Sequence, residues 1–234
     1  MAQKKVNAVI HSQEKLAEGI YSMWLDAPEM AKAAVPGQFI AVYTNDQSKL
    51  LPRPISICEA DKENGRLRIV YRIAGAGTKE FSAYKEGDTL DIMGPLGNGF
   101  PLKKKKAFLI GGGIGIPPML ELAKNLDCEK TAVIGYRDKE TFLADELRKY
   151  ADVVIATEDG SVGTKGNVID AIRAEKLTAD IIYACGPTPM LKALKTYAME
   201  NGIECYISLE EKMACGIGAC LGCVCHSKDI DEHS

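Results

Sequence analysis

The stretch Ala107-Phe-Leu-Ile-Gly111-Gly112-Gly113-Ile-Gly115-Ile-Pro117-Pro118 passes from an apolar run through a glycine-rich loop to a pair of prolines. The apolar run predicts a buried strand, and the prolines, which suit the first turn of a helix, predict a helix at 118–126. Glycines at such a junction let a pyrophosphate approach the backbone near the positive end of the helix. The spacing departs from the G-x-G-x-x-G pattern, so a tight turn that requires glycine is the alternative interpretation.

The residues after this loop alternate between strand and helix patterns. We expect strands at 131–135, 153–156, 181–184 and 203–209, with helices at 142–150, 168–175 and 190–200. This alternation predicts an α/β domain with a doubly wound parallel sheet. The segment Cys185-Gly186-Pro187-Thr-Pro-Met190 ends one of these strands, at the carboxyl edge where such sheets bind ligands. Alone it could be only a helix start, but with the glycine loop it predicts a nucleotide cleft.

The residues before the loop follow a different pattern. Short β-prone runs at 35–43, 66–73 and 88–93 are separated by turn residues, and Glu63-Asn64-Gly65 is a hairpin signal. Several short strands at this spacing predict a small antiparallel β barrel. We expect one short helix in it, at 78–84, capped by Thr78.

Arg53 stands between two prolines in the segment Leu51-Pro-Arg53-Pro54-Ile55-Ser56 of this barrel. A guanidinium held in this way suits a diphosphate. Gly77-Thr78, at the start of the short helix, would offer a second anion-binding end. The alternative is a proline-rich edge strand with an exposed arginine, followed by a glycine turn.

Near the end of the chain, Cys215, Cys220 and Cys223 follow the C-x4-C-x2-C spacing of plant-type [2Fe–2S] loops. The glycines between them suit a backbone that folds tightly and points N–H groups at sulfide. The alternatives are a zinc site, which usually pairs two short spacings, and a redox pair of cysteines. A plant-type loop needs a fourth cysteine. The chain reaches Ser234 without one further downstream of the loop.

Composition agrees with two globular domains and a tail. The 234 residues are 46% hydrophobic and 26% charged, and we expect a barrel at 1–101, an α/β domain at 102–208 and a cluster segment at 209–234. The net charge of −3 predicts no nucleic-acid partner, and the run Lys103–Lys106 is interpreted as a solvated connector. No apolar run approaches the ~18 residues of a membrane span, so we expect a cytoplasmic protein without membrane contact.

In order and spacing, these motifs resemble the ferredoxin–NADP reductase superfamily over essentially the whole chain. The cysteine segment, from Glu210 to Cys225, resembles that of the electron-transfer subunits of B-type dihydroorotate dehydrogenases. The resemblance implies that FAD is held by Arg53, Pro54, Ile55, Ser56, Val70, Tyr71, Arg72, Gly77 and Thr78. It implies that a nicotinamide nucleotide is held by Gly111, Gly112, Gly113, Gly115, Pro117, Cys185, Gly186 and Pro187, with Cys185 near the ring. It assigns Cys215, Cys220 and Cys223 to a [2Fe–2S] cluster. The fourth ligand would then lie on a segment beyond Ser234, on the interpretation that the segment is truncated, with Cys225 and His226 as weaker candidates.

Cofactor choice is indicated by the end of the strand at 153–156. Glu158 and Asp159 lie near where superfamily members that use NADP carry basic residues. Two carboxylates there would repel a 2′-phosphate, so we expect NAD to be preferred, although Lys165 opposes this.

These cofactors imply electron transfer rather than acid–base catalysis. A nicotinamide exchanges two electrons as hydride and a [2Fe–2S] cluster takes one, so a flavin that does both must lie between them. The sequence offers no obvious base or nucleophile for an organic substrate, and hence no catalytic residue, so we place the substrate site on another chain. The resemblance implies an FMN-containing dihydroorotate dehydrogenase subunit, in a heterotetramer with two copies of each chain. Electrons would then pass from dihydroorotate through FMN, cluster and FAD to NAD⁺, in pyrimidine biosynthesis.

Two other functions fit parts of the pattern. A related flavin and iron–sulfur subunit could serve a hydrogenase, a sulfide dehydrogenase or a ferredoxin:NADP oxidoreductase. A chain without catalytic activity could carry a zinc-stapled tail. The first would leave the fold and cofactors unchanged and alter only the partner.

Overall fold

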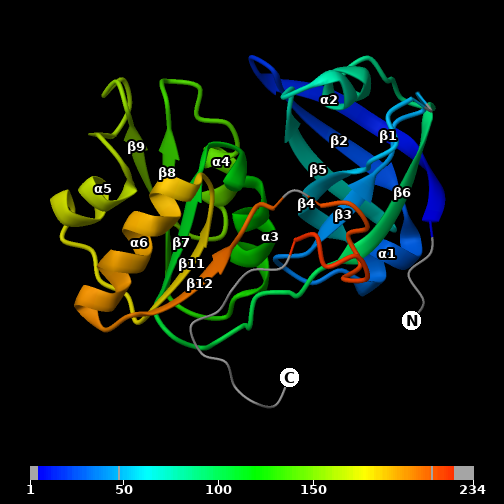
Figure 1. The fold of residues 1–234 in the computed structure, drawn as a ribbon. Helices are drawn as coiled ribbons and strands as arrows, with labels where there is room; N and C mark the ends of the chain where they lie inside the picture. Colours follow the sequence, from blue (N-terminus) through cyan, green and yellow to red (C-terminus); the bar gives the residue numbers. More distant parts are fainter. Residues whose placement is uncertain (1–4, 47, 212, 224–234) are drawn as a thin grey trace, which may run out of the picture.

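Two units follow one another in the computed structural model, which describes residues 5–46, 48–211 and 213–223 (Figure 1). The first is a closed barrel with the strand order β1-β2-β5-β4-β3-β6. Every pairing in it is antiparallel, as predicted from the short, turn-separated runs. Its strands are β1 (Lys5–Ala17), β2 (Ile20–Asp26), β3 (Phe39–Val42), β4 (Arg53–Asp61), β5 (Arg66–Arg72) and β6 (Thr89–Leu96).

Alternation along β5 divides its side chains between two apolar clusters. Leu67, Ile69 and Tyr71 belong to the interior of the barrel. Val70 points the other way and packs in a cluster formed mainly by the second unit. The strand is therefore buried on both sides, and its outer face carries the contact between the units.

Two short helices complete the barrel, α1 (Pro28–Ala33) and α2 (Ala76–Phe81). The second begins two residues before the predicted start, so Thr78 is not its N-cap. Gly75 holds the cap position with an extended backbone, and the Thr78 hydroxyl reaches back to accept hydrogen bonds from the N–H of Ala74 at 2.9 Å and of Gly75 at 3.2 Å. The prediction was wrong because a glycine can occupy the cap without a side chain.

The second unit is a parallel sheet in the order β10-β9-β8-β7-β11-β12, which confirms the predicted α/β fold. Its strands are β7 (Ala107–Gly112), β8 (Lys130–Tyr136), β9 (Asp152–Thr157), β10 (Thr164–Lys165), β11 (Ile181–Cys185) and β12 (Glu204–Ser208). Its helices are η1 (Gly113–Gly115), α3 (Pro117–Asn125), α4 (Ala144–Leu147), α5 (Val168–Ala174) and α6 (Thr188–Asn201).

The helix α4 is much shorter than the 142–150 expected. Leu143, directly before it, has a φ of +64°, which a helix cannot continue through. The carbonyl of Phe142 accepts a hydrogen bond from the Tyr136 hydroxyl at 2.7 Å instead of taking part in a helix. A tertiary contact thus overrides the local helical pattern.

The order of the strands places a switch point between β7 and β11. After β7 the chain adds β8, β9 and β10 on one side, then returns to add β11 and β12 on the other. In the register of these strands, Cys185 pairs with Gly111 on one side and with Ser208 on the other. Open parallel sheets bind ligands at the carboxyl ends of the strands that flank such a point. The glycine loop and the Cys185 segment both begin there.

The connector between the units is exposed, as predicted, but its lysines are also paired. Lys103 and Lys105 both contact Glu204 on β12, the second at 2.9 Å. Lys104 pairs with Asp127 at 2.9 Å, and Lys106 pairs with Glu129 at 2.7 Å.

The segment after β12 returns toward the barrel, where the described part of the tail ends (Figure 1, orange to red). A Cβ placed on Gly216 would lie 3.4 Å from Cδ1 of Leu96 on β6, so the cysteine loop rests on the barrel. Over the described ranges, the helices are all too short or too polar to cross a membrane.

Two hairpin glycines of the barrel allow a matched stability test. Gly19 and Gly65 have φ values of +70° and +69°, but only at Gly65 would a Cβ collide, at 2.8 Å from Cβ of Pro28. We expect Gly19→Ala to lower the free energy of unfolding by about 1–2 kcal/mol through backbone strain alone. Gly65→Ala should cost more, because Pro28 and α1 must also move. Urea unfolding of both variants checks this. An equal loss of unfolding free energy in the two variants would show that α1 can move away from the new Cβ without cost.

Candidate functional site

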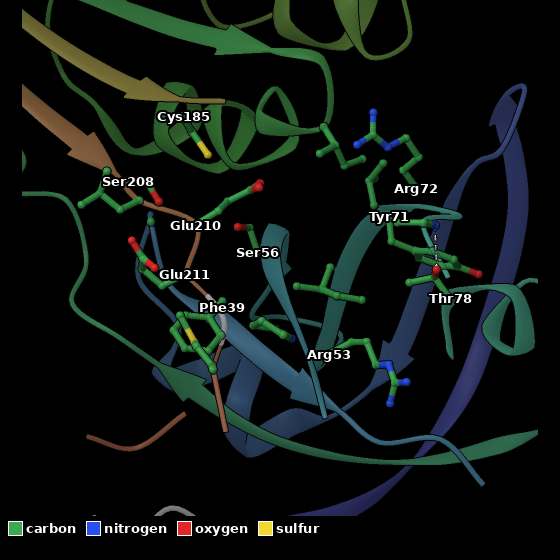
Figure 2. Close-up of a pocket in the computed structure, with 18 residues that line it drawn as sticks. Phe39, Arg53, Ser56, Tyr71, Arg72, Thr78, Cys185, Ser208, Glu210 and Glu211 are labelled. Carbon is green, nitrogen blue, oxygen red and sulfur yellow. Dashed lines mark hydrogen bonds between the residues drawn. The ribbon is translucent and has the colours of Figure 1, made fainter. Parts of the chain in front are cut away.

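A cavity of about 320 Å³ lies where the barrel, the parallel sheet and the tail meet (Figure 2). The predicted FAD residues line it with the exception of Gly77: Arg53, Pro54, Ile55, Ser56, Val70, Tyr71, Arg72 and Thr78. They come from the starts of β4 and α2 and from the end of β5. Segments that lie far apart in the sequence therefore form one wall.

Gly77 lies against Arg53 rather than at the cavity surface. A Cβ on Gly77 would lie 2.2 Å from Nε and 2.4 Å from Cζ of Arg53, so only glycine leaves room for the guanidinium. Nη1 of Arg53 donates a hydrogen bond to the carbonyl oxygen of Leu51 at 2.5 Å. The guanidinium is thus held over the first turn of α2, and Arg72 adds a second positive charge to the cavity wall.

The second wall comes from β11 and the glycine loop. Cys185 is buried, with an exposed fraction of 3%, and its side chain points toward the cavity (Figure 2). Burial raises the pKa of its thiol to about 11; a hydrogen bond with Ser208 opposes the shift and the carboxylate of Glu210 adds to it. The thiol is therefore protonated at neutral pH and is not a nucleophile.

The glycine loop and the Cys185 segment meet backbone to backbone. A Cβ on Gly115 would lie 2.3 Å from the carbonyl oxygen of Cys185, and one on Gly112 would lie 2.7 Å from Sδ of Met190. A Cβ on Gly111 would lie 2.8 Å from Cα of Ile116. For these three positions, tight packing is by itself a sufficient reason for glycine.

Gly113 and Gly186 differ from those three in backbone conformation. Gly113 has a φ of +52° and open space on its Cβ side, so it is the glycine of this loop that a bound ligand could approach. Gly186 has a φ of +153°, and a Cβ there would lie 2.6 Å from Cε of Met190. Pro187 precedes α6, and Pro117 is the first residue of α3.

Glu158 and Asp159 lie apart from the cavity. They follow β9, two strands away from β7 at the same carboxyl edge of the sheet, and both are exposed. The carboxylate of Asp159 accepts a hydrogen bond from the N–H of Ser161 at 2.9 Å, which lowers its pKa. Lys165 belongs to the same corner, because its Cβ would lie 3.0 Å from a Cβ on Gly160.

The third wall of the cavity, which the segment between β12 and the cysteines provides, was not predicted from the sequence. Ser208, Leu209, Glu210, Glu211 and Met213 line the cavity beside Phe39 and Cys185 (Figure 2). The available signal was the predicted strand itself, since a strand next to β11 must end beside Cys185. The residues after such a strand have to cross the edge where the ligand sites lie.

The cysteine loop directs backbone N–H groups at sulfur. Sγ of Cys215 accepts hydrogen bonds from the N–H of Cys220 at 3.4 Å and of Ile217 at 3.5 Å. These bonds lower the pKa of the Cys215 thiol to about 6, and the bond from Cys220 has the largest effect. Gly216 and Gly218, with φ values of +69° and +79°, make the turns that aim the N–H groups.

The described part of this loop does not gather three side chains of metal-binding type around one point. Cys215, Cys220 and Cys223 are all free thiols there. The donor set nevertheless suits iron and sulfide, since it offers a stabilised thiolate and inward N–H groups. Cys225 and His226 lie outside the described residues.

Two family models match the chain. Residues 7–100 match the oxidoreductase FAD-binding domain, and residues 210–233 match the iron–sulfur cluster binding domain of dihydroorotate dehydrogenase B. The first match covers the barrel with its half of the cavity, and the second begins within the third wall.

Curated relatives match over nearly the whole chain. The electron transfer subunit of dihydroorotate dehydrogenase B (NAD(+)) from Bacillus velezensis is 41% identical, over 97% of this chain and 92% of its own length. The subunit of the same name from a Geobacillus species is 43% identical, over 96% and 90%. A solved structure, of an NADH-dependent reduced ferredoxin-NADP oxidoreductase in a study of flavin-based electron bifurcation, is 32% identical with a TM-score of 0.85. It covers 95% of this chain and 83% of that one.

The contact between Gly115 and Cys185 can be tested on the thiol. In Gly115→Ala the new Cβ must push the Cys185 carbonyl away, which separates the two loops and exposes Sγ. We expect alkylation of Cys185, followed by peptide mass spectrometry, to become at least tenfold faster at a fixed pH below its pKa. Gly113→Ala, which strains φ but meets no atom, is the matched control. If Cys185 stays as slow in Gly115→Ala as in the control, the loops are not in contact.

Proposed function

This chain belongs to the family of electron-transfer subunits of dihydroorotate dehydrogenase B, and on that premise we propose which residues hold each cofactor and how the chain works with its partner. It is an oxidoreductase subunit that uses FAD, an iron–sulfur cluster and NAD⁺, and it transfers electrons in pyrimidine biosynthesis. One observation carries the assignment of sites: a single cavity has walls from the FAD-binding barrel, from Cys185 and from the segment that leads to the cysteines.

In this proposal FAD occupies the cavity. Arg53 and Arg72 meet its diphosphate, and the guanidinium of Arg53, which is held by other contacts, forms charge-assisted hydrogen bonds at little entropic cost. Pro54, Ile55, Ser56, Val70 and Tyr71 supply the remaining barrel wall, and Gly77 and Thr78 shape the start of α2. The barrel unit, at 1–101, would thus be the flavin domain.

The nicotinamide nucleotide would bind at the switch point of the sheet, in the unit at 102–208. Gly113 lets the phosphates approach the backbone; Gly111, Gly112, Gly115, Gly186 and Pro187 hold the two loops together; and Pro117 starts α3. Cys185 lies at the boundary with the flavin cavity, where its protonated thiol would contact the nicotinamide. Glu158 and Asp159 would favour NAD over NADP by repelling a 2′-phosphate, against the opposing charge of Lys165.

The segment at 209–234 would carry the [2Fe–2S] cluster on Cys215, Cys220 and Cys223. The fourth ligand lies outside the described residues in this proposal, with Cys225 and His226 among the candidates. The N–H groups that donate to Sγ of Cys215 stabilise negative charge on sulfur, which is what a thiolate-bound cluster requires. The catalytic subunit would supply an FMN that oxidises dihydroorotate, in an assembly with two copies of each chain.

FAD exchanges hydride with a nicotinamide and single electrons with a cluster, so it links the two redox partners. The chain's own residues have three tasks in this arrangement. Arg53 and Arg72 bind FAD and orient it through its diphosphate. Cys185, being protonated and buried, packs without reacting. The segment 208–211 and Met213 cover the cavity and reduce its exposure to water.

A second candidate function shares these sites. The 32% identity to an NADH-dependent reduced ferredoxin-NADP oxidoreductase, over 95% of this chain, favours a subunit that serves a ferredoxin-linked enzyme. Fold and cofactors would be the same, so the partner chain distinguishes the two.

The function is tested by co-expression with the dihydroorotate dehydrogenase catalytic subunit. We expect NAD⁺-dependent oxidation of dihydroorotate by the complex. Cys220→Ser should reduce it at least a hundredfold, because the cluster lies between the two flavins. Reduction of an artificial dye by NADH should stay within about twofold, since it needs only the FAD and nucleotide sites. Oxidation at the wild-type rate in Cys220→Ser, or no oxidation by the wild-type complex, would contradict the proposed route.

The FAD site is tested at Arg53 and at the glycine beneath it. Arg53→Ala removes a charge-assisted contact worth about 1.5–3 kcal/mol, so FAD affinity should fall by roughly tenfold to a hundredfold. Gly77→Ala should weaken FAD binding comparably, because its Cβ displaces the guanidinium. Gly75→Ala, where a Cβ meets nothing within 4 Å, is the matched control and should keep the wild-type affinity. Fluorescence titration of apoprotein with FAD measures all three, and wild-type affinity in Arg53→Ala would remove this residue from the site.

A further inference from the structure

A buried arginine joins the two units on the side of β5 that faces the second unit. Arg68 is 4% exposed, and its Nη1 and Nη2 donate hydrogen bonds to the two carboxylate oxygens of Glu146 on α4, at 2.5 and 3.1 Å. Its Nε donates to Oγ of Ser22 at 2.9 Å, and its guanidinium lies 5.7 Å from the ring centroid of Trp24. Glu59 on β4 adds a carboxylate oxygen at 3.6 Å.

A second polar contact joins the units at α3. Glu121 is 3% exposed, and one of its carboxylate oxygens accepts a hydrogen bond from the backbone N–H of Ala60 on β4 at 3.0 Å. The other accepts from the side chain of Asn125 at 3.0 Å. Lys124, on the same helix, pairs with Glu59 at 2.5 Å. Arg68 and Lys124 thus share the carboxylate of Glu59, which links Arg68 to α3.

The elements joined here are those that carry the two cofactor sites. On β4, Arg53–Ser56 line the flavin cavity and Ala60 bonds to Glu121. On β5, Arg68 lies two residues before Val70, which lines the same cavity. On α3, Glu121 follows four residues after Pro117, which closes the glycine loop. Each polar contact therefore lies two to four residues along the chain from a site residue.

Directional contacts can set an orientation that apolar packing leaves loose. Apolar surfaces attract without direction, whereas a buried guanidinium or carboxylate that loses its partner is strongly disfavoured. In the observed placement of the units Arg68 and Glu121 both have their partners, and a shift of one unit against the other would separate them. Hydride transfer demands reacting atoms about 3–3.5 Å apart, and a misplacement of about 1 Å can lower the rate about a hundredfold.

We propose that Arg68 and Glu121 are positioning residues that set the distance between the nicotinamide and the flavin. The inference rests on the proposed assignment of the cavity to FAD and of the switch point to the nucleotide. Neither side chain lines the cavity, so each acts through the strand or helix that carries it.

Glu146→Gln tests this in the complex with its partner subunit and bound FAD. It keeps the shape of the side chain but removes the charge that pairs with Arg68. We expect the rate constant for FAD reduction by NADH, measured per bound FAD in a single turnover, to fall at least tenfold. The affinities for FAD and NAD⁺ should stay within about twofold, and a primary deuterium isotope effect from labelled NADH should become larger. Asp145→Asn is the control on the same helix: it removes an exposed ion pair with Arg148 and should match the wild type on every readout.

Rescue separates positioning from general stability. Glu146→Asp, which keeps the charge that pairs with Arg68 on a shorter side chain, should retain more of the rate than Glu146→Gln. If Glu146→Gln fails to fold, Glu121→Gln is measured in its place with the same expectation. A wild-type rate constant in the variant, or loss of FAD binding instead of rate, overturns the inference. Failure of the wild-type complex to reduce FAD with NADH would overturn the proposed function itself.

Discussion

The contact between Gly115 and the Cys185 carbonyl is the constraint on which the arrangement of the site depends. Because a Cβ on Gly115 would lie 2.3 Å from that oxygen, the loop after β7 and the segment after β11 can close on each other only if this residue is glycine. Their closure brings the Cys185 side chain to the cavity of the barrel unit. The carboxyl edge of the sheet, where the nucleotide is proposed to bind, and the wall proposed for the flavin therefore share one boundary residue.

The barrel holds its side of that boundary by a different kind of contact. On the barrel, Val70 joins an apolar cluster with residues of α3 and α4, and Arg68 adds charged, directional bonds to α4. Apolar burial supplies most of the attraction between the units, and the buried ions select one orientation from those that burial would allow. Val70 thus contributes to the stability of the interface and Arg68 to the relative orientation of the units, and both lie on the same face of β5.

Sequence patterns predicted the architecture because the spacing of apolar residues indicates which side chains are buried, and both units are built around buried apolar side chains. The parallel sheet, the barrel and the barrel residues of the cavity are all visible as alternation or as motifs such as Arg53-Pro54-Ile55-Ser56. The missed features depend on residues brought together by the fold. Arg68 resembles any of several charges on a strand, and nothing local indicates that it is 4% exposed beside Glu146, 78 residues away. Thr78 and α4 were misplaced for the same reason, since Gly75 and Leu143 decide those boundaries by backbone conformation.

The segment after β12 limits how far the cysteine loop can lie from the cavity proposed for FAD. Met213 lines the cavity, and Cys215 comes two residues later. Two residues of fully extended chain span at most about 7 Å, so the Cα atom of Cys215 stays within that distance of the Cα atom of Met213 in any conformation of the loop. If the cluster binds Cys215 and FAD fills the cavity, as proposed, covalent connection alone keeps the two close together. The same short connection explains why the residues that cover the cavity belong to the tail. β12 ends beside Cys185, and the chain after it passes over the cavity before the cysteine loop reaches the barrel.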